Sequence, residues 1–414
     1  MAGKRLASIE ERDLKNFKYF DRLNPLLERL HDVGTKSDKA GNRLLFYDQY
    51  VSLVLLYFFN PVITSLRSLQ KATGFDKVKK LLGVRRTSLG SLSESAAGAF
   101  DAESLRAIIQ ELAAKALPLQ TSREAEALRG LTAVDGSILP ALPRMAWALW
   151  NGGCQRAAKL HLAFDVLKSV PADATITPAA SSEHTQLRAM LRAGLLYVLD
   201  RGYAGYELFR DVLDAGSSLI ARVKDNTAFT VDHERPISQA AKDVGVVRDA
   251  VISRLGTDHH KDVLKRPMRL VIVRRTKPDG SPEELWLITD RLDLDAELVA
   301  LAYRFRWTVE LFFRWLKCIL GCRHLISNSE NGVTIQLYVA LIASLLIALN
   351  TGRKPTKRTL EMIQFYLLGW ASLEEVEAHL AELAVAEQRA AQKAAAARAA
   401  AAKIAADNAK YAHY

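Results

Sequence analysis

The feature that most constrains this chain is the segment YRFRWTVELFFRWLK, residues 303–317, whose apolar residues recur with the period of an α-helix. On a helix at about 100° per residue, four polar side chains share one narrow stripe: Tyr303, Arg306, Glu310 and Lys317. The opposite side is apolar, and a helix this apolar is expected to be mostly buried. Since charges leave water only when paired or liganded, a buried carboxylate among cations needs a chemical reason. The alternative is a surface stripe with an Arg306–Glu310 pair, which would contribute roughly a few tenths of a kcal/mol.

Two further carboxylates follow short apolar segments upstream. Leu131–Val134 is predicted to be a strand that ends at Asp135, and Leu195–Leu199 a strand that ends at Asp200. Open α/β sheets build their sites at the carboxyl ends of strands, so the two carboxylates converge if these strands are neighbours. Each aspartate also has a local interpretation, because Asp-Gly is a turn signal and Asp200 could cap the next helix. Together with Glu310 they supply hard oxygen ligands, which suit Mg²⁺ or Mn²⁺.

The spacing of the stripe residues is similar to the Y-R-E-K signature of bacterial insertion-sequence transposases of the DDE type, in the insertion sequence four family. Tyr303 is followed after two residues by Arg306, after three more by Glu310 and after six more by Lys317. The segments VDGS at 134–137 and LDRGY at 199–203 resemble the two aspartate motifs of that family. The resemblance covers about residues 131–350 and is absent from the alanine-rich tail.

The resemblance implies that Asp135, Asp200 and Glu310 are the catalytic residues and that they hold two Mg²⁺ or Mn²⁺ ions. The implied activity is hydrolysis at the ends of an insertion sequence, followed by joining of the freed 3′-hydroxyl to target DNA. The implied partners are double-stranded DNA, as terminal inverted repeats and target, and a second copy of the chain in a homodimer on DNA. Two alternatives stay open: a ribonuclease-H-like nuclease without strand transfer, and a catalytically inactive DNA-binding inhibitor. The presence of all three carboxylates argues against the inhibitor.

The resemblance also implies a set of DNA-binding residues. Tyr303, Arg306 and Lys317 are expected to contact phosphates of the transposon end. Arg222 matches a DNA-contacting basic position, although it could be an ordinary arginine at the end of a strand. Trp286 matches a tryptophan on which some relatives stack a flipped-out base, although a core tryptophan in a half-buried strand is an equal alternative.

The pattern of elements predicts an α/β fold. From residue 131 the predicted order is three strands, a helix, a strand, a helix and a strand, which is the order of a ribonuclease-H-like domain. Residues 131–350 would form this catalytic domain, interrupted at about 226–290 by a β-strand insertion with strands at Val247–Leu255, Met268–Thr276 and Glu284–Asp290. Asn331–Leu349 is predicted to be a long apolar helix that packs against the 303–317 segment.

The flanking regions are predicted to be helical. Residues 1–130 would form an N-terminal DNA-binding domain, because residues 67–86 hold seven basic side chains against one acidic one, although such runs are often only solvated. Residues 351–414 would form a helical C-terminal region with an alanine-rich tail.

The formal charge is +11, from 57 Lys and Arg against 46 Asp and Glu, which fits a polyanionic partner. No signal-peptide pattern is present and the longest apolar runs are short for a bilayer, so we expect a soluble, cytoplasmic, nucleoid-associated protein without a membrane partner.

Overall fold

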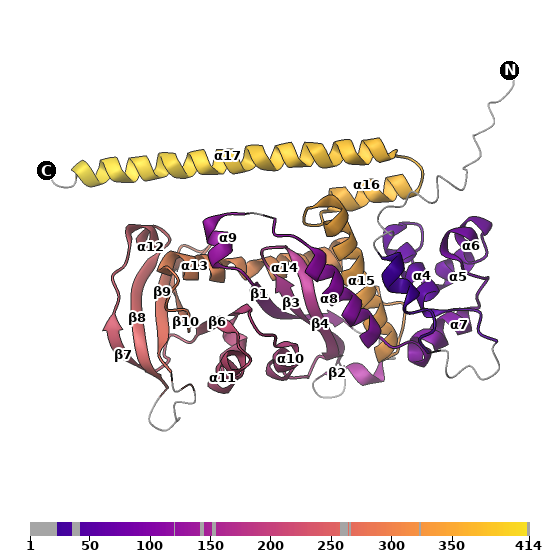
Figure 1. Cartoon of the computed structure of the whole chain (residues 1–414), viewed down its shortest axis with the longest axis horizontal. Helices are drawn as coiled ribbons and strands as arrows, with labels where there is room; N and C mark the ends of the chain where they lie inside the picture. Colours follow the sequence, from indigo (N-terminus) through magenta and orange to yellow (C-terminus); the bar gives the residue numbers. More distant parts are fainter. Residues whose placement is uncertain are drawn as a thin grey trace, which may run out of the picture. The chain divides into compact units, whose positions relative to one another are not determined.

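The computed structural model describes residues 23–34, 42–119, 121–140, 145–150, 155–256, 264, 266–322 and 324–411. Contacts within the chain group it into two compact units. The first unit comprises Met1–Phe58 and Ile63–Lys354, and the second comprises Phe59–Val62 and Pro355–Tyr414. The second unit carries α16 (Lys357–Leu367) and the alanine-rich α17 (Leu373–Tyr411), so the tail is helical as predicted (Figure 1).

A ten-stranded sheet, counted over the described residues, forms the centre of the first unit. Its order is β2-β3-β1-β5-β6-β10-β9-β8-β7, with β4 paired to β3. β1, β5 and β6 are mutually parallel, whereas β3 runs antiparallel to both β1 and β4. The strands are β1 (Leu131–Pro140), β2 (Leu149–Trp150), β3 (Gln155–Asp165), β4 (Val170–Pro178), β5 (Leu196–Leu199), β6 (Ser218–Val223), β7 (Phe229–Glu234), β8 (Val246–Leu255), β9 (Met268–Thr276) and β10 (Pro282–Thr289).

Helices precede, cover and follow this sheet, so the predicted mixed α/β class is confirmed (Figure 1). Those before it are α3 (Asn24–Glu28), α4 (Tyr47–Phe59), α5 (Leu66–Ala72), α6 (Asp76–Leu82), α7 (Leu89–Glu94), α8 (Glu103–Lys115) and α9 (Arg123–Ala127). Those within or after it are α10 (Glu183–Met190), α11 (Tyr206–Asp214), α12 (Gln239–Asp243), α13 (Ala296–Phe305), α14 (Trp307–Arg314) and α15 (Glu330–Thr351).

The helices α10 and α14 lie on opposite faces of the sheet (Figure 1). Leu187 and Met190 of α10 share a buried cluster with Val134 of β1, on one face. On the other face, Phe312 of α14 packs against Phe164 of β3, with ring centroids 5.1 Å apart. Because neighbouring residues on a strand point to opposite faces, the two helices approach alternate side chains of β1 and β3.

The segment between β6 and α13 contains four strands and one short helix. The predicted strand at Met268–Thr276 is found with those bounds, and the two other predicted strands differ by one or two residues at their ends. β7 and α12 were not predicted. β7 is mostly exposed and pairs only with β8, so its sequence lacks the apolar run that marks a buried strand.

α15 is buried along nearly its whole length. It is the one helix within the described ranges that is long and apolar enough to cross a membrane, and it lies inside the first unit. The indole N–H of Trp315 donates a hydrogen bond of 3.0 Å to Ser344 Oγ, which confirms the predicted packing of this helix against the 303–317 segment.

α8 packs against β4 and α15, within the first unit. Arg106 of α8 donates from its Nε to Asp173 Oδ1 of β4 at 2.6 Å, which joins the helix to the sheet. The helices assigned to residues 1–130 therefore include one that completes the core around the sheet. The predicted domain boundaries at 130 and 350 stay predictions.

A buried ion pair stabilises the sheet between β8 and β9. Arg269, 1% exposed, donates to both carboxylate oxygens of Asp249 at 2.8 and 2.7 Å. We expect Arg269→Met to lower the free energy of unfolding by about 3–5 kcal/mol, because it leaves a buried carboxylate without its main partner. Arg248→Met, which removes an exposed pair with Glu234, should cost less than about 1 kcal/mol. Urea unfolding measures both, and equal losses would contradict the assignment.

Candidate active site

The segment that carries Tyr303, Arg306, Glu310 and Lys317 is not one uniform helix. α13 ends at Phe305, α14 begins at Trp307, and a π-helical turn covers Trp315–Ile319. At Arg306 the backbone stays right-handed but tightens, since its N–H bonds to the carbonyl of Tyr303, three residues back. The chain direction is therefore kept, and the predicted helix is correct in extent but interrupted at two places.

Three carboxylates surround the side chain of Arg306. Its guanidinium donates to Glu310 Oε1 at 2.6 Å and lies 3.6 Å from Asp135 Oδ2. Burial lowers the pKa of Arg306, but attraction to Asp200, the hydrogen bond to Glu310 and attraction to Asp135 together raise it above its ordinary value. The structure thus brings the three predicted carboxylates around one cation, although they come from β1, the end of β5 and α14.

The sequence predicts that the first strand ends before Asp135, and this prediction is wrong, because Asp135 lies within β1. β1 continues to Pro140, because residues 132–140 pair with β3 in an antiparallel ladder. The parallel pairing of β1 with β5 covers only Leu131–Ala133. Asp135 therefore sits where β1 parts from β5, and that opening places its carboxylate at the edge of the parallel sheet. Burial raises the pKa of Asp135 to about 6.

Asp200 follows β5 directly, as predicted. Its Oδ1 accepts a hydrogen bond of 2.6 Å from the N–H of Arg201 and one of 3.2 Å from the hydroxyl of Tyr303. Asp200 thus caps the short 3₁₀ turn Arg201–Tyr203, whereas Gly205 is the N-cap of the next helix, α11, so the alternative that Asp200 caps that helix is wrong. The cap and the Tyr303 contact fix the direction of the carboxylate without using its second oxygen in either bond.

Lys317 lies at the far end of the stripe. Its Nζ donates to the carbonyl of Ile138, on the extended part of β1, at 2.7 Å. Lys317, Asp135 and Glu310 line a groove of about 380 Å³ together with Gly136, Ser137, Phe313, Arg314 and Cys318. Two of the three carboxylates thus open onto a groove that also presents basic side chains.

Arg222 and Trp286 lie on the adjacent strands β6 and β10. Arg222 donates to Glu283 Oε1 at 2.8 Å, so it has a carboxylate partner in the protein alone. Trp286 is partly buried and packs edge-on against Phe229, with centroids 5.7 Å apart. For both residues, the structure is compatible with a DNA contact and with a purely structural role, so their DNA contacts stay predictions.

A second group of polar side chains, from β3 and α10, lies on the opposite face of β1. Lys159 of β3 forms an ion pair with Glu183, the first residue of α10. A Cβ at Gly136 would come within 2.7 Å of Lys159 Cε and 2.8 Å of Glu183 Oε1. A Cβ at Gly202 would lie 3.6 Å from Glu183 Oε2. Both aspartate motifs therefore have a glycine where the start of α10 approaches the backbone.

His161 shares this opposite face. Its Nε2 lies 2.9 Å from Thr177 Oγ1, and burial lowers its pKa to about 4. It pairs across the ladder with Gly136 and not with Asp135, so it faces away from the carboxylates. This agrees with a core histidine.

The chemistry of the donors fits a hard divalent cation, since all three are carboxylates. Within the described residues, no group of three or more His, Cys, Asp or Glu side chains is already arranged to hold a metal ion. The guanidinium of Arg306 lies between two of these carboxylates, donating a hydrogen bond to Glu310 and forming an ion pair with Asp135. A metal would have to replace this cation.

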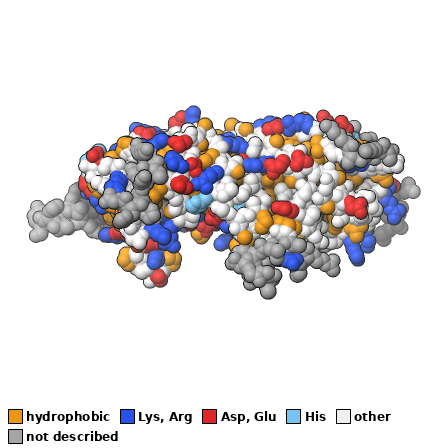
Figure 2. Space-filling model, turned by 90° about the horizontal axis from the view of Figure 1, so that it is seen from below, with side chains coloured by type: hydrophobic (Ala, Val, Ile, Leu, Met, Phe, Trp, Pro, Cys, Tyr) orange, Lys and Arg blue, Asp and Glu red, His pale blue; other side chains and the backbone are white. Residues whose placement is uncertain are grey.

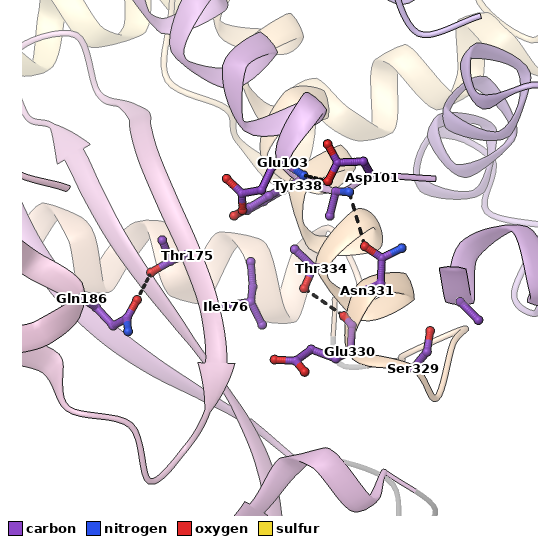
Figure 3. Close-up of a pocket in the computed structure, with 12 residues that line it drawn as sticks. Asp101, Glu103, Thr175, Ile176, Gln186, Ser329, Glu330, Asn331, Thr334 and Tyr338 are labelled. Atoms are coloured by element: carbon purple, nitrogen blue, oxygen red, sulfur yellow. Dashed lines mark hydrogen bonds between the residues drawn. The ribbon is translucent and has the colours of Figure 1, made fainter. Parts of the chain in front are cut away.

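A larger cavity, of about 580 Å³, lies elsewhere in the first unit. Figure 3 shows Asp101, Glu103 and Glu330 around it, with Thr175 and Gln186 on one wall. Its lining is acidic, and it contains none of the three carboxylates that surround Arg306. A phosphate would be repelled there, so the smaller groove beside Asp135 and Glu310 is the better candidate site.

Residues 126–346 match the model of a protein family described as a transposase DDE domain. The chain is 31% identical over 237 residues to y4zB of Sinorhizobium fredii (strain NBRC 101917 / NGR234), a protein named as a transposase, covering 57% of this chain and 64% of that protein. It is 28% identical over 250 residues to a Geobacillus stearothermophilus protein named as a transposase for insertion sequence element IS5377, covering 59% and 64%. The chain thus spans less than two thirds of the length of these two relatives.

Among solved structures, the chain is similar to one described as a cryo-EM structure of the piggyBac transposase synaptic complex with hairpin DNA. The TM-score is 0.41 at 11% identity, and the match covers 89% of this chain and 84% of the other.

The raised pKa of Asp135 predicts a pH-dependent stability of the metal-free protein. A carboxyl whose pKa rises on folding costs no stability below its ordinary pKa and its full cost above the folded value of about 6. We therefore expect Asp135→Asn, in EDTA, to raise stability by about 2–3 kcal/mol at pH 8 and to change it little near pH 3.5. Thermal melts across this range measure the effect. Destabilisation at pH 8 would show that the ion pair with Arg306 outweighs burial.

Proposed function

Because the chain belongs to the family of DDE transposases, we propose that it cuts DNA at the ends of an insertion sequence and joins those ends to target DNA. The observation that carries the proposal is the convergence of Asp135, Asp200 and Glu310 around the one guanidinium of Arg306. Carboxylates that need a cation between them are the side chains that a divalent metal uses in phosphoryl transfer. The groove beside them is lined by Arg314 and Lys317, which suits a phosphodiester.

Asp135, Asp200 and Glu310 would hold the divalent cations, with two Mg²⁺ or Mn²⁺ ions proposed. Bound there, the ions would activate the attacking hydroxyl and stabilise the leaving oxygen. The hydrogen bond from Tyr303 and the capped Arg201 N–H keep Asp200 in one orientation, so that carboxylate is positioned before any ligand arrives.

Arg306 has two roles in this proposal. In the protein alone it partly neutralises the carboxylates, and with metal and DNA bound it would turn to a phosphate of the DNA end. Arginine suits this exchange, since its planar fork binds carboxylate and phosphate in the same way. Lys317, Tyr303 and Arg222 would contact further phosphates, and Trp286 would stack on a base.

The finer fold and the assembly are also proposals. The order β4-β3-β1-β5-β6, with only β3 reversed, supports a ribonuclease-H-like core, and β7 to β10 would be its insertion. The exposed basic residues of α5 and α6 support DNA binding by the N-terminal helices. Cutting two ends together requires two active sites, so a homodimer on DNA is proposed.

The test is cleavage of labelled DNA that carries the ends of the element, in Mg²⁺ or Mn²⁺. We expect nicking by the wild type and a loss of at least about 100-fold in Glu310→Gln, because one ligand of the cations is removed. DNA binding should remain in this variant. Glu297→Gln, the same change near the start of α13, serves as the control and should cut normally. Equal cutting by Glu310→Gln would remove Glu310 from the site.

A second assay separates the proposed transposase from a nuclease. Pre-cleaved ends with a free 3′-hydroxyl are incubated with a supercoiled plasmid and Mg²⁺. Joined products support strand transfer, whereas cutting of intact ends without any joined product would favour the nuclease. Tight DNA binding with neither reaction would favour the inactive inhibitor.

A further inference from the structure

Glu283 of β10 lies between two arginines from the strands on either side of it. Arg222 of β6 donates to Oε1 at 2.8 Å, and Arg275 of β9 donates to Oε2 at 2.7 Å. The side chains of Glu283 and Arg222 are 18% and 21% exposed, and that of Arg275 is 55% exposed. Burial raises the pKa of Glu283, but the two guanidiniums together lower it by a larger amount. The pKa of Glu283 therefore lies below its ordinary value. Each carboxylate oxygen is thus held by a different arginine.

This group is connected to the candidate active site through Tyr303. The hydroxyl of Tyr303 donates to Asp200, and the positive charge of Arg222 acts on that same hydroxyl. The order Asp200, Tyr303, Arg222, Glu283, Arg275 therefore leads from the carboxylates onto the strands β10 and β9. A DNA strand that enters the groove and continues along this line would meet the two arginines.

A purely structural role explains this cluster poorly. Partly exposed ion pairs contribute about 0–1 kcal/mol, and β9 already supplies Arg269 to the buried pair with Asp249 of β8, which suits that role. The carboxylate of Glu283 also brings two arginines, from the strands on either side, together on one anionic group. A phosphodiester offers the same two oxygens and the same charge as a carboxylate, and arginine binds both with its planar fork.

We propose that Arg222 and Arg275 form a binding site for one phosphodiester of DNA, and that the carboxylate of Glu283 occupies this site in the DNA-free protein. The inference rests on the proposed function. DNA has to displace Glu283, so the protein competes with its own ligand at this site. Contacts to the backbone carry no sequence information, so the effect concerns affinity for any duplex.

The neighbouring pair offers a matched control. On the ladder between β9 and β10, Arg275 faces Glu283 and Arg274 faces Glu284. Adjacent residues point to opposite faces, so the Arg274–Glu284 pair, at 2.8 Å, lies on the other face of the sheet. Glu283→Gln and Glu284→Gln change the net charge equally, and only the first frees Arg222 and Arg275. On the face shown in Figure 2, Lys and Arg side chains are interspersed with Asp and Glu side chains. The control is therefore a glutamate–arginine pair on the same two strands, β9 and β10.

The experiment measures binding of a random-sequence 40-base-pair duplex in EDTA, by fluorescence anisotropy over a range of salt concentrations. We expect Glu283→Gln to bind at least about three-fold tighter than the wild type, with a salt slope steeper by about one, because one more phosphate is neutralised. Glu284→Gln should show less than half of that gain. Thermal melts of each variant verify that it is folded.

Two arginine variants complete the test. Arg275→Ala combined with Glu283→Gln should lose the gain in affinity, and Arg222→Ala combined with Glu283→Gln should lose it too. Equal effects of Glu283→Gln and Glu284→Gln, or a gain that survives both arginine substitutions, would overturn the inference. If the wild type cuts element ends while these variants do not differ, the proposed function stands and only this site fails. If the wild type neither binds nor cuts DNA, the proposed function fails first.

Discussion

The attraction between Arg306 and three carboxylates is the interaction on which the rest of the site depends. Asp135, Asp200 and Glu310 come from elements far apart in the chain, and their mutual repulsion opposes the packing that brings them together. The guanidinium bonds to Glu310, lies beside Asp135 and attracts Asp200. Packing of α14 on β1 and β3 therefore occurs with the charges of the three carboxylates partly balanced.

The backbone around the aspartates is shaped by a contact on the opposite face of the sheet. The first turn of α10 places Glu183 against Gly136 and near Gly202, with Lys159 as its counter-ion. The backbone next to both aspartates therefore lies close to this charged pair, on the face of the sheet opposite to the carboxylates. Since Lys159 Cε and Glu183 Oε1 occupy the space that a Cβ would take at Gly136, close approach explains this glycine, which has no positive φ.

The sequence allowed several parts of this structure to be predicted for clear physical reasons. The apolar segment Met268–Thr276, which a turn sequence follows, located β9 with its observed bounds. The three carboxylates were recognisable because their spacing and their positions beside short strands are local properties. The length of β1 could not be predicted, because its extension past Asp135 depends on pairing with β3 and not on an apolar sequence. The contacts of Glu183 and Glu283 join residues far apart in sequence, and no local pattern reveals such partners.

The burial of α15 on all sides has a consequence for how the protein is made. A helix with apolar residues around its whole circumference has no face that water tolerates, so it depends on neighbours that are already folded. Two of its neighbours, α8 and β4, are synthesised about 150 to 250 residues earlier. The surface of α8 and β4 that α15 covers is therefore exposed until α15 has been synthesised. A nascent chain stopped before residue 330 would therefore carry all three proposed catalytic carboxylates and still lack the buried helix α15. Premature termination before residue 330 would thus yield an aggregation-prone product instead of a shortened enzyme.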